Sequence, residues 1–177
     1  MKSFAPLLLA AAISFPFAIH HVHAEEGTMK KLQIASPVFP HNGMIPSKFT
    51  CDGADVSPAL SFANVPGKTR SLALIVDDPD APAGTWVHWV VWNIGADTRE
   101  IAENAVPPGA IQGTNDFGKQ RYGGPCPPSG THRYYFKLYA LDASLTLDPG
   151  ATKARIEEAM RGHVLSQAEL VGLYRRK

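Results

Sequence analysis

Short apolar segments separated by stretches rich in proline and glycine recur along the chain. The segments 71–76, 86–93, 133–141 and 170–174 are rich in aliphatic, β-branched and aromatic residues. Runs of this length and composition, bounded by turn residues, are typical of β-strands. Proline and glycine contribute 15 residues each and are spread along the chain instead of forming a linker. The pattern therefore predicts a mainly β protein with many strands and ordered loops.

One segment, 152–161, has helical periodicity. Its apolar residues Ile156, Ala159 and Met160 fall on one face of a helix. A proline precedes the segment and a glycine follows it, as is common at the two ends of a helix. The sequence therefore predicts one helix near the C-terminus.

The composition is that of an ordinary globular domain. The chain has 177 residues, of which 45% are hydrophobic and 19% are charged, and this length suggests a single domain. The formal net charge is +1, so no field is present that would favour nucleic acid or an anionic membrane surface.

Residues 1–24 resemble a secretory signal peptide. A basic start precedes an apolar run at 7–19, and small or aliphatic residues lead up to Ala24. The run is short for a membrane span and contains Pro16. An uncleaved anchor or a buried helix is the alternative. We expect cleavage near Ala24, a single domain at 25–177, and a periplasmic or secreted protein without an integral membrane span.

The chain has two cysteines, Cys51 and Cys126. In an exported protein such a pair is expected to form a disulfide. The bridge would close a loop of roughly 75 residues, worth about 4 kcal/mol in the chain-entropy model. Two free buried thiols, or one reactive thiol, are the alternatives.

The stretch 77–93, DDPDAPAGTWVHWVVWN, places three aspartates and one histidine beside all three tryptophans. Pro79 and Pro82 remove backbone donors, so 77–85 is predicted to be a loop that follows the first strand. The chain then re-enters the sheet as a strand, and both faces of that strand are apolar, which favours a central position. Period two divides this strand into Trp86, His88, Val90 and Trp92 on one face and Val87, Trp89 and Val91 on the other.

The stretch 122–135, YGGPCPPSGTHRYY, has the same construction, with a rigid loop that leads into a strand. A lone strand histidine is usually a hydrogen-bonded core residue, and loop aspartates usually cap their own backbone. Two units that each combine a rigid loop, a strand start and a histidine favour a binding site instead. Period two places His132, Tyr134 and Phe136 on one face and Arg133, Tyr135 and Lys137 on the other, where Arg133 is expected to pair with a carboxylate.

These two units resemble the signatures of the phosphatidylethanolamine-binding protein family, also called the Raf kinase inhibitor proteins. DDPDAP followed by WVHWVVWNI is similar to the first signature, and GGPCPPSGTHRYYFKLYAL is similar to the second. The segments 51–58 and 114–118 resemble the bacterial exported branch. The resemblance spans 33–174 and implies a large antiparallel sheet packed on a smaller sheet, with a few short helices.

The resemblance also implies a small anion-binding pocket near the surface. An anion is held by hydrogen-bond donors, and an aspartate beside a histidine favours the protonated imidazole. Eukaryotic members have two prolines where this chain has Pro125 and Cys126. Their pocket rim also uses a C-terminal helical tail, which residues 173–177 do not resemble. The residues implied as pocket walls are Asp78, Asp80, Trp86, His88, Gly124, Pro125, His132 and Tyr134.

Three classes of function are consistent with these residues. The first is the binding of a small anion, such as phosphate, a carboxylate or phosphorylethanolamine, together with modulation of a partner protein. The second is inhibition of a protease or a host signalling protein. The third is metal-dependent hydrolysis, but the chain has no HExxH motif, and no serine or cysteine has an evident base partner. We therefore expect a binding protein without catalytic residues, metal or cofactor.

Overall fold

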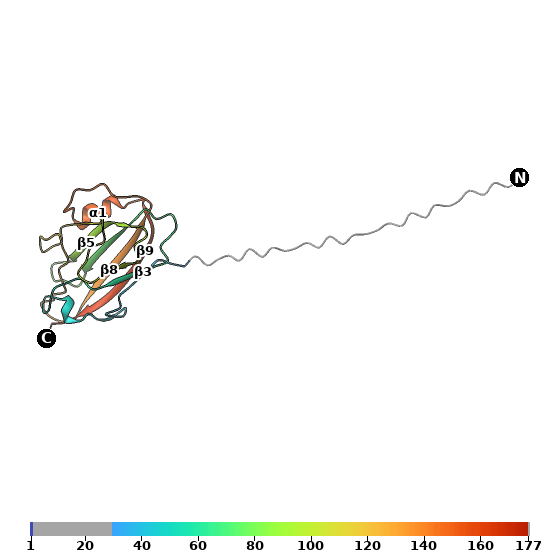
Figure 1. Cartoon of the computed structure of the whole chain (residues 1–177). Helices are drawn as coiled ribbons and strands as arrows, with labels where there is room; N and C mark the ends of the chain where they lie inside the picture. Colours follow the sequence, from blue (N-terminus) through green and yellow to red (C-terminus); the bar gives the residue numbers. More distant parts are fainter. Residues whose placement is uncertain (2–29, 177) are drawn as a thin grey trace.

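The computed structural model describes Met1 and residues 30–176 (Figure 1). The expected signal peptide, Met1 apart, and its cleavage site lie outside the described residues. Within the part of the chain that is described, no helix is long and apolar enough to cross a membrane.

Residues 30–176 fold into two β-sheets, with one α-helix and one short 3-10 helix. The larger sheet has the strand order β2-β9-β8-β4-β5-β7 and is antiparallel except for the β2–β9 pair, and the smaller sheet has the order β1-β3-β6. This architecture confirms the expected fold class. The elements are β1 Gln33–Ala35, β2 Gly43–Met44, η1 Ser47–Phe49, β3 Leu60–Ala63, β4 Ser71–Asp78, β5 Trp86–Gly95, β6 Glu100–Ile101, β7 Ile111–Gln112, β8 His132–Leu141, α1 Lys153–Ala159 and β9 Val164–Tyr174.

The larger sheet is buried on both faces. On one face its apolar side chains pack against those of the smaller sheet, including Ile34, Leu60 and Ile101. On the other face they pack against Ile156 and Met160, which belong to α1 and its C-terminal end. Figure 1 shows α1 beside β5, and β8 and β9 running side by side. Burial on both faces explains the continuous apolar runs of β4 and β5 in the sequence.

All four predicted strands are longer in the structure, and the differences in β4 and β9 have clear causes. β4 continues through Asp77 and Asp78, so the expected loop begins two residues later than predicted. Both carboxylates can stay in the strand because each has a partner: Asp77 has two lysines, and Asp78 has His132. β9 begins at Val164 instead of Leu170, since its first half alternates exposed and half-buried residues and lacks an apolar run.

A β-bulge in β5 makes the predicted face assignment partly wrong. The register to β4 changes from Val76↔Trp89 to Asp77↔Val87, which leaves His88 as the extra residue. The bulge puts His88 and Trp89 on the same side, where they contact Tyr134 and Tyr122 respectively. Strict alternation had placed them on opposite faces, and it fails because a bulge inserts one residue into the period.

Helix α1 is shorter than predicted. Thr152 has extended backbone angles and is the N-cap, so the first helical residue is Lys153. The helix ends at Ala159, and Gly162 adopts φ +79°, a left-handed conformation that suits glycine after a helix. The predicted apolar face is correct, because Ile156 and Met160 are buried against the sheet.

Candidate functional site

A cavity of about 250 Å³ opens where the end of β4 meets the starts of β5 and β8. Its walls are mostly apolar, with a few polar side chains, which is the usual construction of a ligand site. Five of the expected residues line it, namely Asp78, Trp86, His88, His132 and Tyr134. The other residues in its wall are Ala81, Pro82, Phe117, Cys126, Pro127 and Pro128.

His88 is held at the bulge by the backbone of Gly123 and the side chain of Asn115. Its Nδ1 lies 2.7 Å from the carbonyl oxygen of Gly123, and its own carbonyl oxygen accepts hydrogen bonds from Gly123 N and Asn115 Nδ2. The ring packs edge-on against Tyr134 and Phe117. Burial lowers the pKa of His88 below its ordinary value, although the Gly123 carbonyl and the Asp78 charge oppose the shift.

Asp78 and His132 form a buried pair across β4 and β8. Nδ1 of His132 lies 2.7 Å from Oδ2 of Asp78, and the side chains are only 9% and 4% exposed. The other oxygen, Oδ1, accepts the backbone N–H of Asp80 at 2.8 Å. The carboxylate therefore orients the imidazole and is itself fixed by the loop that follows β4.

Tyr134 contributes a buried hydroxyl beside this pair. The side chain is fully buried, and its oxygen has no hydrogen-bond partner among the described residues. Burial raises the pKa of the phenol above its ordinary value, and the nearby charge of Asp78 adds to the shift. A buried polar group without a partner is uncommon and points to a water or ligand that completes it.

Asp80 was expected in the pocket wall but does not line the cavity. It forms a two-point ion pair with Arg133, with Nη2 at 2.6 Å from Oδ1 and Nε at 2.9 Å from Oδ2. The backbone N–H of Arg133 donates to the same carboxylate. This pairing confirms that Arg133 meets a carboxylate, and it joins the loop after β4 to the start of β8.

Gly124 and Pro125 also lie next to the cavity without lining it. A Cβ on Gly124 would meet the Phe49 carbonyl oxygen and Thr50 Cα, each at 2.7 Å, so the residue must be glycine to pack against that segment. Its N–H donates to Asp55 Oδ1 at 2.6 Å. The carbonyl oxygen of Pro125 accepts the N–H of Cys51. Both residues therefore position the loop 122–131.

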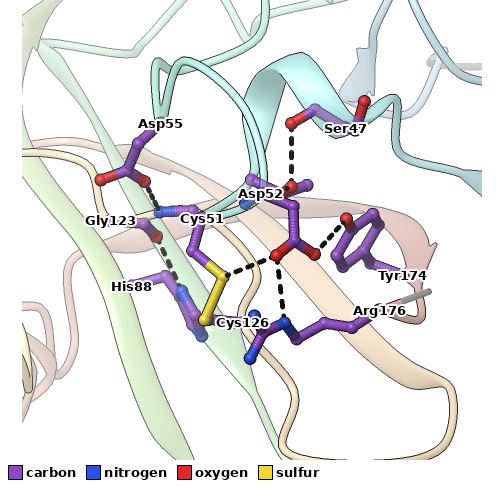
Figure 2. Close-up of a disulfide and its surroundings, with 11 residues drawn as sticks. Ser47, Cys51, Asp52, Asp55, His88, Gly123, Cys126, Tyr174 and Arg176 are labelled. Carbon is purple, nitrogen blue, oxygen red and sulfur yellow. Dashed lines mark hydrogen bonds and ion pairs between the residues drawn. A yellow bond between two sulfur atoms is a disulfide. The ribbon is translucent and has the colours of Figure 1, made fainter.

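Cys51 and Cys126 form a disulfide, as expected, and Cys126 belongs to the cavity wall. Figure 2 shows the bridge between the His88–Gly123 contact and a cluster around Asp52. Asp52 accepts hydrogen bonds from the Tyr174 hydroxyl at 2.7 Å and from Arg176 Nε at 3.1 Å. The bridge thus connects the pocket loop to the segment after η1 and, through Asp52, to the end of β9.

Asp77 points to the opposite face of the sheet from Asp78. Its carboxylate is fully buried between two lysines, with Lys137 Nζ at 2.8 Å and Lys153 Nζ at 2.6 Å. Lys153 is the first residue of α1. Adjacent aspartates at the end of β4 therefore serve two separate sites, one in the cavity and one under the helix.

Sequence reasoning missed Phe117, which packs edge-on against both Trp86 and His88. Asn115 fixes the Phe117 loop, because its Oδ1 accepts N–H groups of Phe117 and Lys119. The segment 114–118 had been recognised as similar to the family, and this signal could have led to Phe117. Within the described residues, no three His, Cys, Asp or Glu side chains are placed to share a metal ion.

The model of the family described as phosphatidylethanolamine-binding protein matches residues 35–175. The chain belongs to this family. A "UPF0098 protein" of Methanothermobacter thermautotrophicus is 53% identical over 150 residues, which cover 82% of this chain and 99% of that protein. A relative with the same family designation from Pyrococcus horikoshii is 45% identical over 186 residues, covering 100% of this chain and 91% of that protein.

Solved structures show the same fold. A Chlamydia trachomatis protein named as a homolog of phosphatidylethanolamine-binding protein superposes with a TM-score of 0.80 at 43% identity, over 83% of this chain and 99% of that one. YbcL of E. coli, named as a member of the mammalian PEBP family, gives a TM-score of 0.79 at 32% identity, over 84% of this chain and 100% of that one.

Proposed function

We propose that this protein binds a small phosphate- or carboxylate-type anion in the cavity between β4, β5 and β8. The observation that carries the proposal is the state of the two histidines. Each histidine uses Nδ1 for a contact within the protein. The Nε2 atom of each ring has no hydrogen-bond partner among the described residues and is accessible to solvent. Two imidazole nitrogens are therefore left for a ligand in one cavity.

The surroundings of these nitrogens support an anion over an apolar ligand. Trp86, Phe117, Pro127 and Pro128 give the cavity mostly apolar walls. Hydrogen bonds in such a low-dielectric place are stronger than in water. Tyr134 belongs to the same wall, and its buried hydroxyl has no hydrogen-bond partner among the described residues.

The size of the cavity favours a headgroup-sized ligand. A volume of about 250 Å³ is below that of most sites for drug-sized molecules. The family name refers to phosphatidylethanolamine, whose headgroup is phosphorylethanolamine. This headgroup combines a phosphate with an ammonium group, which can donate a hydrogen bond to the Asp78 carboxylate. We propose this headgroup and inorganic phosphate as the ligands to test first.

The proposal has three further parts: the protein is exported, it binds its ligand without catalysing a reaction, and it modulates a protein partner. The disulfide supports export, since such bonds persist in oxidising compartments. Inhibition of a protease or a host protein stays an alternative without a specific structural observation in its favour.

The test is calorimetric titration of the purified protein with inorganic phosphate, phosphorylethanolamine and acetate. We expect saturable binding that weakens by about tenfold or more in His88→Ala and in His132→Ala, since a hydrogen bond to a charged group contributes about 1.5–3 kcal/mol. His163→Ala is the matched control, because His163 also pairs with an aspartate, Asp142, but at the far end of β8.

Urea unfolding of each variant separates lost binding from lost folding. NMR signals of the wild-type imidazoles provide a test that needs no variant: His88 and His132 should shift with phosphate, while His41 and His163 should not. Unchanged affinity in both folded cavity variants would refute the proposed site.

A further inference from the structure

The hydrogen-bond partner of His88 determines which of its ring nitrogens carries the proton. The partner of Nδ1 is the carbonyl oxygen of Gly123, which can only accept. Nδ1 must therefore be the protonated nitrogen. In the neutral ring Nε2 then holds a lone pair and is an acceptor, not a donor.

The same holds for His132. Its Nδ1 faces Oδ2 of Asp78 at 2.7 Å, and the carboxylate is also bonded to the Asp80 N–H. A carboxyl group gives up its proton more readily than an imidazolium, so the shared proton belongs to Nδ1. The Nε2 atom of neutral His132 is again an acceptor, so both nitrogens left for a ligand present lone pairs.

No fixed cation compensates for these acceptors, because the described residues that line the cavity include no lysine or arginine. The charged groups close to the histidines are already engaged. Asp80 is paired with Arg133. Asp77 is held by two lysines on the other face of the sheet. Four other titratable groups lie near the two rings. Asp78 and Tyr134 are in the cavity wall, and Asp116 accepts a hydrogen bond from Val87 N. Tyr174 lies opposite His132 in the β8–β9 pair, and its hydroxyl donates to Asp52.

We propose that this cavity binds its anion together with a proton, so that near neutral pH it selects ligands that can carry one, such as a phosphate monoester, over sulfate. The proposal rests on the anion binding put forward above. A fully deprotonated anion would face two imidazole lone pairs and one carboxylate, and the only side-chain donors of the described cavity wall are the indole N–H of Trp86 and the hydroxyl of Tyr134. A proton on the ligand, or on Nε2 of either ring, turns one of those lone pairs into a hydrogen bond.

The low pKa of His88, caused mainly by burial, fits this arrangement. A ring that stays neutral near pH 7 cannot hold an anion by charge before the ligand arrives. It gains a proton only when the ligand supplies the proton or stabilises the imidazolium.

The experiment compares methyl phosphate with sulfate by calorimetry, at several pH values between about 6 and 8. At pH 7.5, in buffers of different ionisation enthalpy, binding of methyl phosphate should take up about one proton. Sulfate should bind at least about tenfold more weakly at this pH. Affinity for both ligands should rise as the pH falls, by up to about tenfold per pH unit for each proton taken up.

Two variants sharpen the test. In Asp78→Asn the negative charge that favours the protonated ring of His88 is removed, so the pH at which binding strengthens should move lower. His163→Ala, on the exposed pair with Asp142, should leave the proton count and the pH profile as in the wild type.

The outcomes separate this proposal from the one on which it rests. Equal affinities for sulfate and methyl phosphate at pH 7.5, with no proton taken up, would overturn the proton-linked selectivity and leave anion binding intact. Absence of binding by either ligand at pH 6 would remove both proposals.

Discussion

At the scale of single residues, Asp80 shows how a carboxylate beside a site can belong to the scaffold. The Arg133 guanidinium, by its hydrogen bonds, holds the pKa of Asp80 at about 2, below the ordinary value of 3.8. A carboxyl whose pKa is lowered by folding stabilises the protein above its unfolded-state pKa. This contribution is lost as the pH falls from about 4 towards about 2.

Replacement of this residue should therefore change stability in a pH-dependent way. We expect Asp80→Asn to lower the free energy of unfolding relative to wild type at pH 5 and above. The difference should shrink to near zero by about pH 2, where Asp80 itself becomes protonated. Urea unfolding across the pH range measures it, with the exposed Asp97→Asn as control. A difference that stays constant with pH would show that the ion pair is not its source.

The sequence predicted the residues of the cavity better than their individual roles. Trp86, His88 and His132 were identified from two loop–strand units, and they do share one cavity. Asp80 and Gly124 were placed in the wall by resemblance, but an arginine and a backbone segment hold them outside it. These partners come from distant parts of the chain, so spacing within a motif could not reveal them.

At the scale of elements, the end of β4 ties the cavity to α1. Asp78 orients His132 on one face, while Asp77 is bound by Lys137 and by Lys153 on the other. The sequence showed adjacent aspartates but assigned both to a loop. The loop was predicted from Pro79 and Pro82, and nothing near Asp77 in the sequence marks the pairing lysines, which lie 60 and 76 residues away.

The helix contact can be tested by removing one lysine. We expect Lys153→Met to lower the free energy of unfolding by about 1–3 kcal/mol. This loss is smaller than that expected for a buried carboxylate without any partner, because Lys137 still pairs with Asp77. Arg155→Met on the same helix should change it by less than about 0.5 kcal/mol, because its pair with Glu158 is exposed. Equal effects of the two substitutions in urea unfolding would contradict a specific role for the Asp77 contact.

The bulge in β5 is the element-scale feature that periodicity could not predict. An extra residue at His88 turns two neighbouring side chains, His88 and Trp89, to the same face. Nothing in the letters WVHWVVW marks the insertion, because both faces of the strand are apolar. The bulge is fixed by the backbone of Gly123 and the side-chain amide of Asn115, which hydrogen-bond to His88.

At the scale of the whole molecule, the disulfide joins segments that the sheets leave apart. It connects residues 75 positions apart, between the segment after η1 and the pocket loop. Three hydrogen bonds join the same two segments: Cys51 N to Pro125 O, Gly124 N to Asp55, and the Tyr122 hydroxyl to Phe49 O. The folded geometry of the loop therefore has supports besides the covalent bond.

This arrangement predicts that the bridge stabilises the protein more than it shapes the cavity. In the double variant Cys51→Ser/Cys126→Ser, the free energy of unfolding should fall by about 2–4 kcal/mol, because the unfolded chain is no longer closed into a long loop. Affinity for methyl phosphate should change little, since the three hydrogen bonds keep Pro127 and Pro128 in place. Treatment of the wild type with a reducing agent should reproduce both results.

The opposite pattern has a distinct physical meaning. Unchanged stability with a large loss of affinity would show that the exposed Cys51–Cys126 bond holds the cavity wall in the folded state. The hydrogen bonds to Asp55 and Phe49 would then be insufficient to position the loop. Comparison of unfolding and binding in the same variant thus decides whether the bridge acts on the unfolded chain or on the site.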